Sequence, residues 1–129
     1  MKKVELYEQY LKEEGFAPNV DGDGDVAFKF EGGTYYILTN ESDPRYFAMV
    51  FPNFWSIENG EELRKAYTAA NDVSRETKVV KVHVNGKQTN VNASVEVYVD
   101  EPTGFRPFMK RALAVLQYAV GQFRAKMVG

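Results

Sequence analysis

The spacing of hydrophobic positions predicts a long helix near the end of the chain. Apolar residues recur at three- and four-residue steps throughout residues 105–127, and this period places them on one continuous stripe. At ~1.5 Å per residue, a helix of this length spans roughly 35 Å. We therefore expect it to lie across a whole sheet, beginning near Gly104 with Pro107 in its first turn.

Two shorter helices are also predicted. Residues 3–14 form a short amphipathic segment, which Gly15 can end by adopting a left-handed conformation. A second helix begins after Asn59, whose side chain is a good N-cap, and Glu62 occupies the position that a capping box requires. The apolar spacing continues this second helix as far as Val73.

A first pair of strands is predicted around a glycine turn. Residues 25–30 alternate between apolar and other residues, and a Glu31-Gly32-Gly33 turn leads into residues 34–39. Closing the hairpin on either two-residue pair of this turn places Tyr35 and Ile37 on the face of Phe28 and Phe30. Tyr36 and Leu38 then point to the opposite face.

The third predicted strand, residues 45–51, is apolar on both faces. Pro52 is expected to end it, because proline has no N–H for the ladder, and residues 53–59 then form a connection that contains Phe54 and Trp55. A sheet with two apolar faces needs cover on both sides. The cover could be a helix on each face, or a helix on one face and another protein on the other.

The last two strands, residues 78–84 and 91–99, flank Asn85-Gly86, a dipeptide that favours a two-residue type I′ turn. Closing there pairs Val82 with Thr89 and Val80 with Val91. The valines then share one face, and Lys81, His83, Asn92, Ser94 and Glu96 share the other with Tyr98. The complete pattern predicts one α+β domain over residues 1–129, with an antiparallel sheet and the long C-terminal helix across one face.

Composition narrows the possible functions. The formal charge is -2 and no basic run could follow a phosphate backbone, so nucleic acid is not an expected partner. There is no cysteine, and the N-terminus runs into charged residues, so we expect a cytoplasmic protein without disulfides. No stretch approaches the ~20 apolar residues of a membrane span.

Few residues suggest chemistry. The run from Asp21 to Asp25 resembles the opening of a calcium loop, but Val26 stands where that loop needs glycine, and a solvated turn explains the same residues. His83 is the only histidine, and its strand position predicts a surface residue. We therefore expect no enzyme activity, no metal and no cofactor.

The aromatic fraction, 14%, is the remaining functional signal, because aromatic residues serve both cores and protein contacts. The leading hypothesis is a protein-binding role, chaperone-like or regulatory, through an apolar sheet face, and the alternative is a small-molecule sensor whose pocket uses the same aromatics. The candidate contact residues are Tyr36, Leu38, Phe47, Met49, Phe51, Phe54, Trp55 and Tyr67.

In order, the expected elements are a helix, three strands, a helix, two strands and a helix. This order resembles the fold of type III secretion chaperones, and more closely the YbjN-type family of proposed bacterial sensory transduction regulators. The resemblance is carried by residues 25–32 with Tyr35-Tyr36-Ile37-Leu38, and by residues 66–73, 78–82 and 108–123. It implies a compact domain, often a homodimer, that binds protein and has no enzyme activity.

Overall fold

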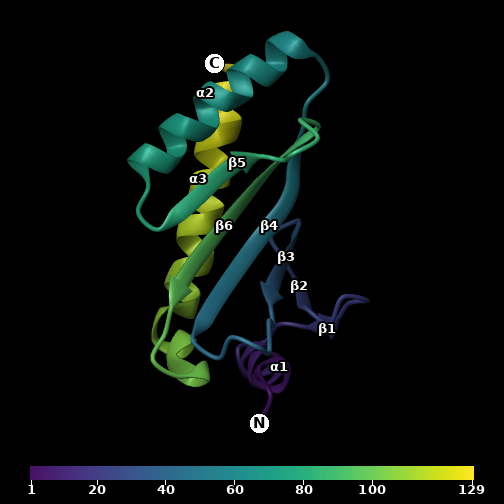
Figure 1. Ribbon diagram of the computed structural model, residues 1–129, viewed down its shortest axis with the longest axis vertical. Coiled ribbons are helices and arrows are strands. Elements are labelled where there is room, and N and C mark those ends of the chain that lie inside the picture. The colour runs from purple at the N-terminus through teal and green to yellow at the C-terminus, as the bar shows by residue number, and fades with distance from the viewer.

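The computed structural model describes all residues, 1–129, and Figure 1 shows its helices and strands. Every element expected from the sequence is present, together with a short edge strand and a 3-10 turn. The elements in order are α1 (Lys3–Glu13), β1 (Asn19–Val20), β2 (Val26–Phe30), β3 (Gly33–Leu38), β4 (Tyr46–Ser56), α2 (Gly60–Glu76), β5 (Val80–Val84), β6 (Asn90–Tyr98), the 3-10 helix η1 (Pro102–Phe108) and α3 (Met109–Val128).

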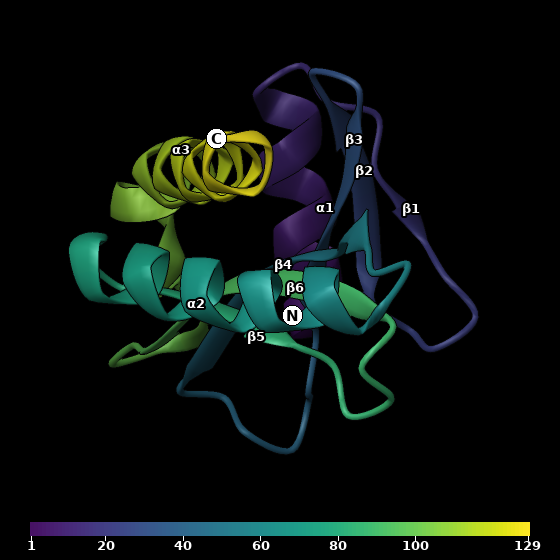
Figure 2. The same cartoon turned by 90° about the horizontal axis from the view of Figure 1, so that it is seen from above.

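The six strands form one antiparallel sheet in the order β1-β2-β3-β4-β6-β5. Viewed along α3, β2 and β3 turn away from the plane of β4, β6 and β5, so the sheet curves around α1 and α3 (Figure 2). This architecture confirms the expected α+β class, with the long C-terminal helix packed against one face.

The core lies between the concave face of the sheet and the helices. One cluster of 28 buried residues joins α1, α2 and α3 to the strands. The stripe predicted on the C-terminal helix is confirmed as its buried face, which includes Leu116, Ala119 and Phe123. Helix α2 lies along the outer edge of β5, where the Val82 N–H donates to Ser74 Oγ at 2.9 Å. This contact covers an edge that could otherwise pair with another strand.

Most of the aromatic residues belong to this core. Phe47 stacks on Phe105 with ring centroids 5.9 Å apart, and Tyr7 meets Phe105 edge to face at 4.9 Å. A second series of ring contacts runs through Phe28, Tyr35, Phe51, Phe54 and Phe123. The aromatic excess is therefore explained mainly by packing within the chain.

The loop from β3 to β4 is fixed by the first turn of α1. Lys3 is 3% exposed, and its Nζ donates to the carbonyls of Asn40, Asp43 and Tyr46 at 3.3, 2.9 and 2.7 Å. In return, the Glu41 carboxylate accepts from the backbone N–H groups of Lys3 and Val4, both at 3.1 Å. The acid satisfies donors that the helix terminus leaves free, and it lies where the helix dipole favours negative charge.

The expectation that Pro52 ends the third strand is wrong. Strand β4 continues to Ser56 through an irregularity between Phe51 and Trp55, where the register to β6 shifts. Asn53 adopts a φ of 52°, and its N–H donates to Asn92 Oδ1 at 2.7 Å. A bulge thus absorbs the proline, because its residues need not supply ladder hydrogen bonds.

The register expected at Asn85-Gly86 is also wrong. Val84 pairs with Val91, and Val80 pairs with Val95, so the loop is four residues longer than a two-residue turn. Asn85 Oδ1 accepts from the N–H groups of Thr89 and Asn90 at 2.9 and 3.2 Å, which stabilises the wider loop. Because the shift is an even number of residues, each side chain keeps its predicted face.

The start of the long helix differs in detail. The chain forms the 3-10 helix η1 over Pro102–Phe108, which contains Pro107, and α3 begins only at Met109. Proline at this point is tolerated because the regular α-helical hydrogen bonds start after it.

Candidate binding surface

One face of the sheet carries no helix. The helices lie on the concave side or along the β5 edge, and the convex side is left open (Figure 2). A row of paired residues crosses this open face from β2 to β5, and the next row joins Leu38, Ala48 and Glu96. The residues of the first row are Ala27, Tyr36, Val50, Ser94 and Lys81.

Small residues form the floor of this open face. Ala27, Ala48 and Ser94 are 5%, 0% and 2% exposed beneath their larger neighbours. Tyr36, Leu38 and Val50 rise above them and are half-buried. Their arrangement leaves an apolar strip along β3 and β4 that no element of the chain covers.

Beside this strip lies a polar network centred on Glu96. Its carboxylate accepts from Tyr46 Oη at 2.6 Å and Ser94 Oγ at 2.6 Å, and it pairs with Lys81 Nζ at 2.7 Å. Partial burial raises the pKa of Glu96, but these three contacts outweigh that effect and lower it to about 2. Burial, together with the hydrogen bond to Glu96, raises the pKa of Tyr46 to about 12.

His83 is exposed on the same face, as the sequence predicts. Partial burial and the nearby Lys81 ammonium lower its pKa, and Glu96 partly opposes this effect. No group of three or more histidine, aspartate or glutamate side chains lies close enough to hold a metal ion. In the Asp21–Asp25 turn, Asp21 Oδ1 accepts from the N–H groups of Asp23 and Asp25 at 2.9 and 3.0 Å. These hydrogen bonds are the ones expected of a solvated turn.

The structure separates the predicted contact residues into several groups. Tyr36 and Leu38 lie on the open face, whereas Phe47 and Met49 are fully buried on the helix side. The β3–β4 register pairs Ile37 with Met49, so Phe47 and Met49, which precede the bulge, belong to the core face. The inclusion of Phe47 and Met49 in one surface with Tyr36 is therefore corrected.

The other predicted residues lie away from the open face. Phe51 and Phe54 pack against each other with ring centroids 5.9 Å apart. Trp55 meets Phe123 edge to face at 5.8 Å, and its Nε1–H donates to Glu62 Oε1 at 2.9 Å. The cleft beside Trp55 is only about 240 Å³ and is lined mainly by polar residues.

Tyr67 lies neither on the open face nor in the core. It is exposed on α2, where its hydroxyl accepts a hydrogen bond from Gln88 Nε2 at 2.8 Å. The structure thus brings together only two of the eight candidates as an open apolar surface.

Solved structures of other proteins share this geometry. The crystal structure of YbjN from E. coli, for which a role as a transcription regulator has been suggested, matches with a TM-score of 0.69 at 11% identity. The match covers 95% of this chain and 91% of YbjN. The chain has the fold of YbjN.

A second solved structure is also similar to this chain. An uncharacterized protein from Methanothermobacter thermautotrophicus matches with a TM-score of 0.59 at 10% identity, over 97% of this chain and 99% of that one. No protein-family model matches this chain, and neither does any curated protein sequence. None of the helices has the length and apolar character required to cross a membrane.

Proposed function

We propose that this chain is a non-enzymatic, cytoplasmic protein-binding domain, chaperone-like or regulatory, and that the helix-free sheet face is its contact surface. The suggested regulatory role of YbjN supports a binding function. The observation that carries the proposal is the half-buried strip of Tyr36, Leu38 and Val50 on a sheet whose helices all lie elsewhere. Aromatic and aliphatic side chains in such positions are common interface anchors.

The first partner to test is a second copy of the chain. The open face carries Lys81 and Glu96 in addition to the apolar strip, so it offers charges of both signs to its own image. In a two-fold interface each patch meets the same patch of the other copy, and such mixed charge allows this pairing. The net charge of -2 opposes self-association only weakly.

The test compares two variants by analytical ultracentrifugation. Tyr36→Glu with Leu38→Glu places two carboxylates on the strip, and both residues are already in contact with solvent. Tyr67→Glu is the matched control, because Tyr67 is an exposed tyrosine on α2 outside the open face. Circular dichroism checks that each variant is folded.

The expected result is a concentration-dependent dimer in the wild type and in Tyr67→Glu, and a monomer in the double variant. A wild type that remains monomeric at every concentration would exclude a second copy of the chain as the partner. Affinity capture with the same three proteins then tests other proteins, and partners retained equally by all three would contradict the proposed surface.

A further inference from the structure

A groove on the opposite side of β6 is independent of the open sheet face. It lies between the end of β6, the segment from α2 to β5, and the first half of α3. Its volume is about 560 Å³, and eight of its twelve lining residues are hydrophobic. The groove exists because β5 stops pairing at Val80, opposite Val95, whereas β6 continues to Tyr98. A cavity of this size and lining is typical of small-molecule sites.

The rim of the groove exposes apolar side chains. Val79 and Tyr118 are 62% and 59% exposed, and they are two of the seven large hydrophobic residues that the chain leaves exposed. Below them, Val97, Phe108 and Val115 pack against the core and form the apolar floor. Tyrosines suit such a rim, because the ring can contact an apolar ligand while the hydroxyl remains in water.

Val79 is also held in a strained conformation. Its φ is 58°, a left-handed value that a β-branched side chain rarely adopts. Strained residues of this kind cluster where ligands bind. Here the strained residue places an apolar side chain at the groove rim.

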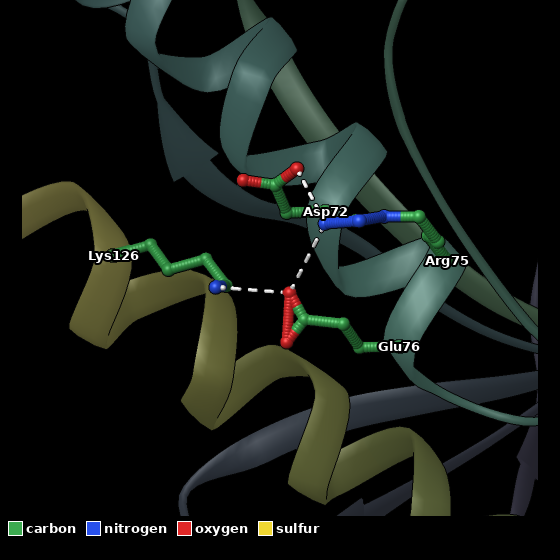
Figure 3. Close-up of polar contacts among 4 residues, drawn as sticks. All are labelled: Asp72, Arg75, Glu76 and Lys126. Atoms are coloured by element: carbon green, nitrogen blue, oxygen red, sulfur yellow. Dashed lines mark hydrogen bonds and ion pairs between the residues drawn. The ribbon is translucent and has the colours of Figure 1, made fainter.

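The charges around the groove favour an anion. Lys78 and Arg111 line it from opposite walls, and neither forms an ion pair or a side-chain hydrogen bond within the chain. Glu76 is the one carboxylate in the lining, and it is already engaged by Arg75 at 3.6 Å and Lys126 at 3.3 Å (Figure 3). The groove therefore presents two available cations and no available anion.

We propose that this groove binds a free, single-chain fatty acid. The alkyl chain lies on the floor of Val97, Phe108 and Val115, and the carboxylate contacts the cations at the rim. Arg111 can hold a carboxylate through two parallel hydrogen bonds, and Lys78 adds a second positive charge. The ligand class follows from the combination of an apolar floor with unpaired cations, since neither feature alone selects it.

The test titrates octanoate, decanoate and dodecanoate into the full chain by calorimetry, below their micelle concentrations. Each added methylene that enters the groove should tighten binding by about two- to fourfold. Amide chemical-shift changes in nuclear magnetic resonance spectra locate the site, and we expect the largest ones in residues 95–98 and 108–118. Decanol, which lacks the charge, should bind at least tenfold more weakly than decanoate.

The matched variants separate this site from general charge effects. Lys78→Gln with Arg111→Gln should weaken decanoate binding by about tenfold or more, and should leave decanol binding unchanged. Lys87→Gln with Arg64→Gln removes the same charge at exposed positions outside the groove, and it should bind decanoate as the wild type does.

Three results would overturn the proposal. The first is the absence of saturable decanoate binding, and the second is an equal loss of affinity in both double variants. The third is binding to phosphatidylcholine–phosphatidylglycerol vesicles without binding to free decanoate, which would identify a membrane surface as the ligand. Failure of the open-face dimer test would leave this proposal intact, because the two tests alter different residues.

Discussion

Glu96→Gln tests the electrostatic centre of the open sheet face. The substitution keeps the shape of the side chain but removes the negative charge that Lys81, Ser94 and Tyr46 contact at 2.7, 2.6 and 2.6 Å. A pKa lowered from 4.5 to about 2 corresponds to about 3 kcal/mol for a fully shielded carboxylate. The Glu96 side chain is 30% exposed, so solvent screening reduces the expected loss at neutral pH to about 1–2 kcal/mol.

The pH dependence of this loss has a definite sign. The pKa of Glu96 is lower in the folded than in the unfolded protein, so the unfolded state binds more protons between pH 4.5 and about 2. The stabilisation is therefore complete above pH 4.5, and it is lost as the pH falls towards 2. In Glu96→Gln this contribution is absent at every pH, so the two free energies of unfolding should converge in acid.

Urea unfolding at pH 7, 4 and 2.5, followed by circular dichroism, measures both effects. Glu58→Gln is the control, because Glu58 is exposed and makes no ion pair or side-chain hydrogen bond. The reasoning is refuted if Glu96→Gln loses no more stability at neutral pH than this control. A difference from the wild type that does not change with pH would refute it as well.

Three further predictions concern the stability of the fold, and each is measured by urea unfolding. Lys3→Met removes the donor shared by three backbone carbonyls and should lower the free energy of unfolding by about 2–3 kcal/mol. A loss below about 1 kcal/mol would show that these hydrogen bonds do not fix the loop. Gly33→Ala places a Cβ 2.7 Å from Cζ of Phe51 and should cost about 1–3 kcal/mol through overpacking; an unchanged stability would mean that the ring moves freely. Val79→Gly relieves the left-handed strain and should stabilise the chain by about 0.5–1 kcal/mol, and a loss of stability would show that the valine makes favourable contacts instead.

The sequence predicted the elements well because their signals are local. The capping residue Asn59 accepts from the Glu62 N–H at 2.8 Å, and the Glu31-Gly32 turn joins Phe30 to its partner Gly33, as the pattern predicts. The loop at Asn85 was mispredicted because the same dipeptide can serve a two-residue turn or, through the asparagine side chain, a longer one. Local propensity does not distinguish these two loops.

The candidate surface could be predicted only in part. Alternation along β3 places Tyr36 and Leu38 opposite Tyr35 and Ile37, and this local inference is correct. Which face of β4 joins them depends on pairing between distant segments, so the sequence could not separate Phe47 from Tyr36. The contacts of Glu96 were missed for the same reason, since its partner Tyr46 is fifty residues away.

Predicting the groove from the sequence requires strand lengths in addition to strand pairing. Its floor exists because β6 extends past the end of β5, and strand lengths at that precision cannot be predicted from sequence patterns. Val95 and Val97 gave only the signal of an alternating strand. Only the three-dimensional arrangement brings them beside α3.

The two proposed surfaces meet in strand β6. Glu96 belongs to the open face, whereas its neighbours Val95 and Val97 line the groove. Because alternate side chains of one strand serve both surfaces, a ligand that shifts β6 acts on groups of both. Any resulting coupling must be reciprocal. If the fatty acid strengthens self-association, the dimer must bind the fatty acid more tightly than the monomer does, by the corresponding factor. Such a relation would give a binding domain of this fold a direct route from a small molecule to a protein contact.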